Sequence, residues 1–199
     1  MRFILIVFFF FSTLILSCQK EETCGKALPY FEIQALQAYN LVFTNDGLNP
    51  WEVITDGKSV DWQNYFIRVG FEMTYTANTV KGGASLYALD CLENGYQGSL
   101  IGLDTLFVIA QSRYNQEYAA GDTLNHIILL SDWTLDVEDF NQNISLNEYL
   151  AINADGVREM NFEIKFTEAP QAEINQFEII YKLENGDEFK TCTEAVELR

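Results

Sequence analysis

The chain has 199 residues, of which 48% are hydrophobic, and its 12 Lys and Arg against 29 Asp and Glu give a formal net charge of −17 at pH 7. This length fits one domain, and the apolar content is sufficient for a substantial core. The acidic balance argues against binding to nucleic acid or to anionic lipid, because both need clustered Lys and Arg. A single histidine and the lack of a Cys-x-x-Cys pair exclude structural zinc.

The first elements in the chain are an export leader and an attachment site. An apolar run over residues 3–16 follows the lone charge of Arg2. It is shorter than the roughly 20 residues that span a bilayer, so it predicts a cleaved secretory signal. The Ile-Leu-Ser-Cys sequence ending at Cys18 resembles a lipobox. That resemblance implies removal of residues 1–17, a diacylglyceryl thioether on Cys18 and an acyl chain such as palmitate on the new amino terminus. An uncleaved anchor and a signal without lipid are the alternatives.

The four residues after Cys18 indicate a location. Gln19, Lys20, Glu21 and Glu22 resemble the signal that sends Bacteroidota lipoproteins to the cell surface. The resemblance implies a protein anchored in the outer membrane and facing the exterior, with residues 18–23 as a lipidated tether. The periplasmic face is the alternative. Residues 24–199 would then form a single folded domain.

Three thiols remain once Cys18 is lipidated: Cys24, Cys91 and Cys192. An oxidising export route favours one disulfide and one free thiol. We favour the pair Cys24–Cys91, which would tie the segment after the tether to the folded body. Closing so long a loop is worth about 4 kcal/mol in the chain-entropy model. The pairing Cys24–Cys192 and the third combination stay open.

The body of the chain alternates apolar and polar residues with a period of two, which is typical of strands with one buried face. Inward residues of the first strand are expected at Phe31, Ile33, Ala35, Tyr39, Leu41 and Phe43. Residues 106–110 are continuously apolar and predict a central strand. Further strands are expected over residues 65–75, 161–167, 177–184 and 188–193.

Turn and helix-capping sequences predict one hairpin and one short helix. Asn185-Gly186 lies between the last two strands and predicts a β-hairpin. Ser145 and Glu148 have capping-box spacing and predict a short helix within the long connection 131–159. Several strands with one apolar face each must bury those faces together, which favours an all-β fold with two antiparallel sheets.

Three stretches resemble a family of Bacteroidota lipoproteins classed as a domain of unknown function. They cover residues 88–99, 104–125 and 166–170. The resemblance implies an immunoglobulin-like antiparallel β-sandwich and a lipoprotein habit. It brings no activity, cofactor or catalytic residue.

The residues give little support to catalysis. His126 is the only imidazole available to a nucleophilic enzyme, and it adjoins an apolar run without a Gly-x-Ser-x-Gly sequence. Asp132, Trp133, Asp136, Glu138 and Asp139 form an acidic group beside an aromatic ring. The region Asp132–Asp139 can therefore be a glycan-binding or glycan-hydrolysing site, or a solvated loop, which is the favoured interpretation.

The sequence also contains candidate sites for calcium and for O-glycosylation. Asp136 to Asn143, and Asn153 with Asp155, supply oxygens suited to calcium, but neither matches the twelve-residue calcium loop. Thr105 and Thr123 each lie in an Asp-Thr-Leu sequence that resembles the acceptor of Bacteroidota O-glycosylation.

We therefore predict a lipid-anchored, non-catalytic binding or envelope-structural module that has no cofactor. Its partner would be an unidentified surface protein or glycan. The alternative is a glycan-binding or glycan-hydrolysing protein that uses Asp132–Asp139. The candidate contact residues are the large aromatic side chains Trp51, Trp62, Trp133, Tyr96 and Tyr114, although core packing is the favoured role for most of them.

Overall fold

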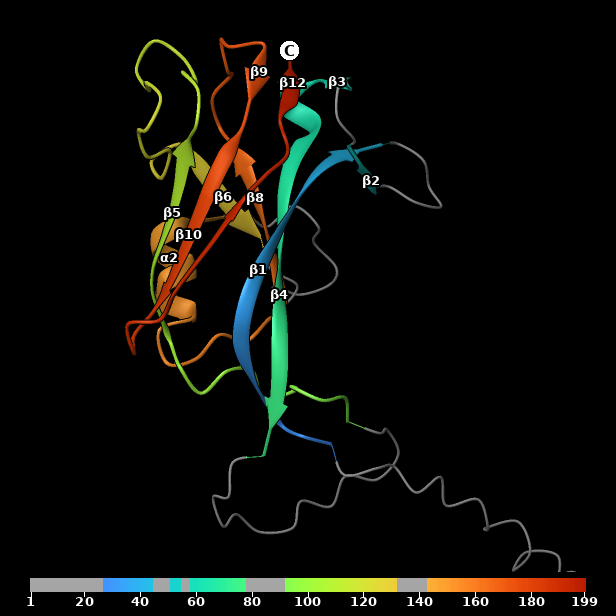
Figure 1. Ribbon diagram of the computed structural model, residues 1–199, viewed down its shortest axis with the longest axis vertical. Helices are drawn as coiled ribbons and strands as arrows, with labels where there is room; N and C mark the ends of the chain where they lie inside the picture. Colours follow the sequence, from blue (N-terminus) through green and yellow to red (C-terminus); the bar gives the residue numbers. More distant parts are fainter. Residues whose placement is uncertain (1–26, 45–50, 55–57, 78–91, 132–142) are drawn as a thin grey trace, which may run out of the picture.

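The computed structural model describes residues 27–44, 51–54, 58–77, 92–131 and 143–199, and it is an all-β sandwich with one short α-helix (Figure 1). The strands and helices in chain order are β1 Tyr30–Phe43, β2 Trp51–Val53, β3 Ser59–Val60, the 3₁₀ helix η1 Trp62–Asn64, β4 Tyr65–Thr76, β5 Leu103–Ala110, β6 Ile128–Ser131, β7 Ile144–Ser145, α2 Leu146–Ile152, β8 Asn161–Phe166, β9 Ile174–Asn175, β10 Phe177–Leu183, β11 Glu188–Cys192 and β12 Val196–Leu198.

The strand order confirms the immunoglobulin-like sandwich. In a constant-type domain, strands A, B, E and D form one sheet and strands C, F and G form the other. Here β2-β1-β4-β8-β6-β7 is one sheet and β11-β10-β5 is the second. The seven principal strands thus follow the order A to G along the chain as β1, β4, β5, β6, β8, β10 and β11. A small third sheet, β3-β12-β9, lies at the end of the sandwich where the chain terminates (Figure 1).

Strand β1 departs from the expected alternation. Phe31 and Ile33 are buried as predicted, but a register shift between Ile33 and Ala35 reverses the direction of the residues that follow. Beyond this bulge Leu36 becomes buried, while Tyr39 and Phe43 are exposed. A bulge adds one residue to one strand, so side chains after it change face, although Leu41 is buried as predicted. The predicted inward positions of Tyr39 and Phe43 are therefore wrong.

Strand β5 is an edge strand of its three-stranded sheet rather than a central one. Its apolar run nevertheless alternates, with Leu106 and Val108 buried and Phe107 exposed. The backbone of this edge is partly capped by Asn125, whose Oδ1 accepts from the Val108 N–H at 3.1 Å and whose Nδ2 donates to the Leu106 carbonyl at 2.8 Å. An edge paired in this way is protected from joining another sheet.

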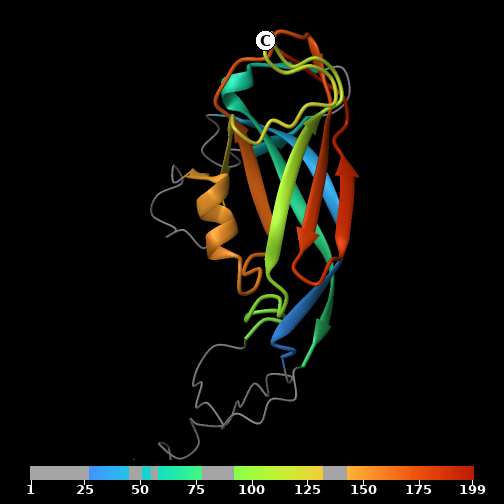
Figure 2. The same ribbon diagram turned by 90° about the vertical axis from the view of Figure 1, so that its left-hand side faces the viewer.

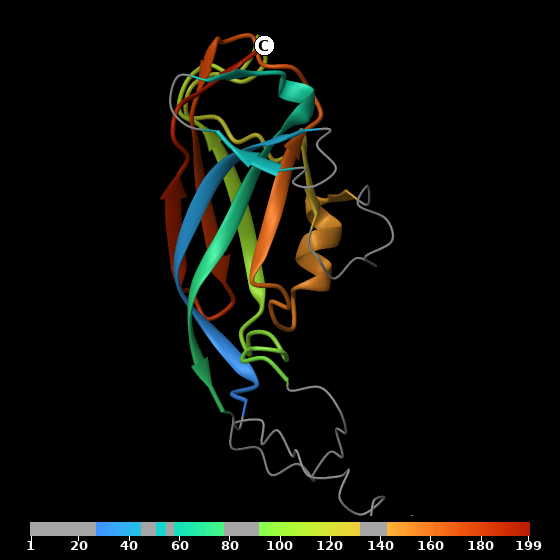
Figure 3. The ribbon, with the colours of Figure 1, turned by 90° about the vertical axis from the view of Figure 1, so that its right-hand side faces the viewer.

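The predicted hairpin and helix are both confirmed. Gly186 adopts φ +91° in the turn between β10 and β11, a conformation that glycine takes at little cost. Ser145 caps α2, and the capping box with Glu148 is complete, since each residue bonds the other's backbone N–H. The helix lies along one side of the sandwich, as Figures 2 and 3 show from opposite directions, and it packs against β5 and β6.

In the described part of the chain, aromatic side chains join the two sheets. Phe166 lies between Phe177, with ring centroids 4.8 Å apart, and Tyr114, at 5.3 Å. In antibody domains the equivalent strands are bridged by cysteines, but β4 and β10 contain none. Among the described residues there is no disulfide: Cys192 is a free, exposed thiol. The favoured pair Cys24–Cys91 lies outside the described residues.

A buried tyrosine should lower the stability of the fold at alkaline pH. Burial and the nearby Tyr114 raise the pKa of Tyr65 well above its ordinary value of 10.0. Above about pH 10 the unfolded chain loses the hydroxyl proton of Tyr65, while the folded state keeps it. The contribution of Tyr65 to the free energy of unfolding is therefore complete below about pH 10 and declines at higher pH. We expect unfolding midpoints in urea to fall above that pH, and to fall less steeply in Tyr65→Phe. An unchanged slope in that variant would contradict the assignment.

Candidate functional site

The solvent-facing side of the six-stranded sheet carries the most organised group of polar and aromatic side chains. We call it the outer face and define it by a group of outward residues on β2, β1, β4, β8 and β6. These residues are Gln37, Tyr39, Phe43, Trp51, Phe66, Arg68, Gly70, Glu72, Ser131, Asn161, Glu163 and Lys165. Pairing aligns them in rows across the strands, because cross-strand partners project on the same side of a sheet.

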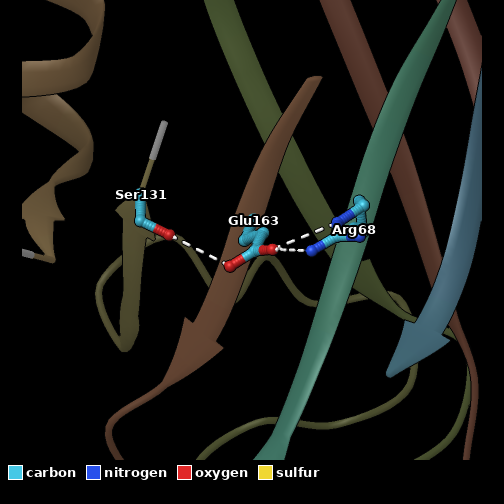
Figure 4. A network of polar contacts seen from close by, with 3 residues as sticks. All are labelled: Arg68, Ser131 and Glu163. Carbon is cyan, nitrogen blue, oxygen red and sulfur yellow. Dashed lines mark hydrogen bonds and ion pairs between the residues drawn. The ribbon is translucent and has the colours of Figure 1, made fainter. Parts of the chain in front are cut away.

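An ion pair forms the central row of the outer face (Figure 4). The Arg68 guanidinium on β4 donates two hydrogen bonds to the same carboxylate oxygen of Glu163 on β8, one of them from Nε at 3.1 Å. Ser131 on β6 lies 3.4 Å from the other oxygen. The Glu163 side chain is only 10% exposed and that of Arg68 is 28% exposed. The network therefore joins three strands and fixes the direction of the guanidinium.

Aromatic rings and cations occupy the adjoining rows. Trp51 contacts Phe43 and Phe66 edge to face, with centroids 5.3 and 5.1 Å apart. Arg68 lies over the Trp51 ring at 5.5 Å, and Lys165 lies over the Phe66 ring at 5.3 Å. Each cation–π contact is worth about 0.5–1 kcal/mol at an exposed site. The rings are thus held in fixed orientations.

A polar row borders the other side of the ion pair. Tyr39 donates its hydroxyl proton to Gln37, and the amide of Gln37 donates to Glu72. Gly70 interrupts this row between Gln37 and Asn161, which are its neighbours on β1 and β8. The Oδ1 of Asn161 is buried and has no hydrogen-bond partner among the described residues.

A hollow lies in the loops at one end of the sandwich. It has a volume of about 320 Å³ and is lined by polar side chains, including Asn115, Glu117, Glu168 and Gln171. The Asn115 side chain is already used: its amide donates to Glu168 at 3.2 Å and its oxygen accepts from two backbone N–H groups. These contacts join two of the stretches that carry the family resemblance and indicate a role in loop structure.

The predicted contact residues are distributed unevenly. Trp51 lies on the outer face, whereas Trp62 packs against the core from η1. Tyr114 is fully buried, and its hydroxyl donates to the Glu168 carbonyl at 2.6 Å, so it packs in the core and is not a contact residue. Tyr96 is exposed but lies outside the outer face. Trp133 and the region Asp132–Asp139 fall outside the described residues, as do Cys18 and Gln19–Glu22.

The remaining sequence candidates have ordinary surroundings. His126 is exposed, and none of the described residues forms a hydrogen bond with its ring. Asn153 is buried, its Nδ2 donates to the Tyr149 carbonyl at 3.0 Å, and its Oδ1, the atom that calcium would need, accepts from the Arg158 N–H at 3.2 Å. Thr123 is exposed beside the edge of β5, and Thr105 is half-buried on β5. Modification of either threonine stays a prediction.

The described part of the chain shows neither a metal-binding group nor a membrane-spanning helix. No three His, Cys, Asp or Glu side chains in it are grouped closely enough to hold a metal ion. Nor does it include a helix with the length and apolarity required for crossing a membrane.

Fold and outer face together define a β-sandwich with an aromatic, ion-paired sheet surface. A comparison with protein-family models found no match for the chain, and neither did a comparison with curated proteins.

Sequence reasoning missed the outer face, although one signal was present. Phe66 occupies a position of β4 where the alternation calls for a polar residue, between Tyr65 and Ile67 that point inward. An aromatic residue on the solvent side of a strand is a sign that this side of the sheet contacts other side chains or a partner. The position of Trp51 beside Phe66 required tertiary structure, because β2 and β4 pair with opposite edges of β1.

The ion pair can be tested by its effect on stability. Arg68→Ala leaves the Glu163 carboxylate nearly buried without its cation, which should cost about 1–3 kcal/mol. Replacing both partners, as Arg68→Met with Glu163→Leu, should restore most of that loss, because no charge is then left buried. Urea unfolding of Arg68→Met, Glu163→Leu and the double variant measures the coupling. If the losses of the two single variants add up to the loss of the double variant, the two side chains do not interact.

Proposed function

We propose that the chain is a non-catalytic, lipid-anchored module of the outer cell envelope that binds a partner through the outer face. The observation that carries the binding role is the outer face itself, with its fixed rings around a nearly buried ion pair. Exposed aromatic groups held in one orientation are typical of binding surfaces, since little conformational freedom is lost when a partner docks. The lipoprotein family resemblance supports the lipid anchor and brings no activity of its own.

The anchor is supported by the sequence at Cys18 and by the place where β1 begins. The first described residues of β1 lie at the end of the sandwich opposite the C-terminus (Figure 1). The outer face runs along the length of the sheet between these ends. A tether attached before β1 would hold the domain by one end and leave the outer face accessible.

The anchor is tested with full-length protein in intact cells. We expect the wild type in the membrane fraction, cleaved by protease added outside, and Cys18→Ala released from the membrane. Cys192→Ala is the matched control, because Cys192 is a free thiol and its loss should change neither result. An unmodified Cys18 in the mass spectrum of the native protein would contradict the proposal.

The binding role is tested with a photo-crosslinking amino acid at Phe43, which is 41% exposed on the outer face. The control position is Phe107, which is 36% exposed on the other sheet. We expect crosslinked partners, protein or glycan, from position 43 in living cells and few from position 107. Equal yields from both positions would refute a role for the outer face.

A further inference from the structure

Gly70 leaves an open space in the outer face. A Cβ atom built on Gly70 meets no atom within 4 Å. Its cross-strand neighbours are Gln37 on β1 and Asn161 on β8. The open space is therefore bordered on both sides by carboxamides, which can donate and accept hydrogen bonds.

Asn161 borders this space with a carboxamide on β8. Its Oδ1 is buried and, among the described residues, lacks a hydrogen-bond partner. Hydroxyl groups both donate and accept, which matches the two carboxamides.

Two aromatic residues of the outer face follow Gln37 along β1, both on the same side of the open space. Tyr39 is 43% exposed, and its hydroxyl is held by Gln37, so the ring has a defined orientation. Phe43 lies four residues further along the strand, about 13 Å away at about 3.3 Å per residue, and abuts Trp51. The apolar faces of sugar rings pack well on such side chains. Two aromatic positions on one strand suit a chain of sugars better than a single unit.

Charge restricts the ligand further. The chain carries a net charge of −17, and Arg68 on the outer face is already paired with Glu163. Lys165, the other cation of this face, lies over the Phe66 ring. A polyanion, or a second copy of the same acidic chain, would therefore be repelled. An uncharged ligand meets no such penalty.

We propose that the outer face binds an uncharged polysaccharide chain across Gly70. Tyr39 and Phe43 pack against its sugar rings, and Gln37 and Asn161 bond its hydroxyl groups. This inference rests on the proposed function and names the ligand class of the same face. It places glycan binding on the sheet, away from the region Asp132–Asp139.

The test is affinity electrophoresis of the full-length protein in non-ionic detergent. Native gels contain dextran, mannan, galactomannan or xyloglucan as uncharged probes, and alginate or heparin as anionic ones. We expect at least one uncharged probe to retard the wild type, and Tyr39→Ala and Gly70→Gln each to weaken that binding tenfold or more. Gly70 has an ordinary φ and open space around it, so Gly70→Gln fills the site without disturbing the fold, as thermal unfolding will check.

Tyr96→Ala is the matched control, because Tyr96 is 42% exposed outside the outer face, against 43% for Tyr39. It should bind like the wild type. The inference is overturned if no uncharged probe retards the protein, if only anionic probes do, or if Tyr96→Ala loses as much binding as Tyr39→Ala. A protein crosslinked at position 43 without glycan binding would overturn it while leaving the proposed function standing.

Discussion

Gly102→Ala should destabilise the protein by about 3 kcal/mol or more, because the new methyl group has no space. A Cβ atom built on Gly102 lies 1.6 Å from the carbonyl oxygen of Ala154, a backbone atom just beyond α2. The two segments are also joined by the Leu103 N–H, which donates to the Asn153 carbonyl at 2.9 Å. Relief of the overlap must separate α2 from the start of β5 and weaken that bond.

Thermal unfolding of the full-length protein measures the effect. For a chain of this size, a loss of about 3 kcal/mol lowers the midpoint by about 6–12 °C. Gly70→Ala is the control, because its Cβ meets nothing within 4 Å and its midpoint should stay within about 2 °C of the wild type. If both variants unfold at the same temperature, the close approach of Gly102 to Ala154 is wrong.

Phe166→Ala should cost about 3–5 kcal/mol, the range for a buried phenylalanine. Phe166 is 2% exposed and stacks on Tyr65 at 6.2 Å and on Phe177 at 4.8 Å, so its ring contacts both sheets. Its removal leaves a cavity between the sheets that the neighbouring rigid rings cannot fill. The chain lacks a cysteine pair in β4 and β10 to hold the sheets together.

Urea unfolding with a fluorescence or circular dichroism signal measures this loss. Phe107→Ala provides the matched control, because Phe107 lies on the solvent side of β5 and should change stability by less than about 1 kcal/mol. Phe166→Leu should recover part of the loss by filling some of the cavity. A cost for Phe166→Ala no larger than that for Phe107→Ala would show that the aromatic cluster does not hold the sheets.

Local patterns predicted the elements that depend on nearby residues. The alternation over β4, β8 and β10, the glycine turn at Gly186 and the capping box at Ser145 are each set by neighbours within a few positions. The same patterns failed where a distant contact decides. The bulge in β1 changes which side chains face the core, and Tyr114 is buried because its hydroxyl reaches Glu168 on a distant segment.

The sequence alone determined the all-β class, the hairpin, the helix start and the acidic charge, because periodicity, turn chemistry and composition are local or additive properties. It also carries the prediction of a lipid on Cys18. Tertiary structure alone decided the outer face. Its ion pair joins residues 68 and 163, and its aromatic cluster joins β1, β2 and β4. Such groupings follow from strand order, and strand order depends on which apolar faces pack together rather than on any short stretch of chain.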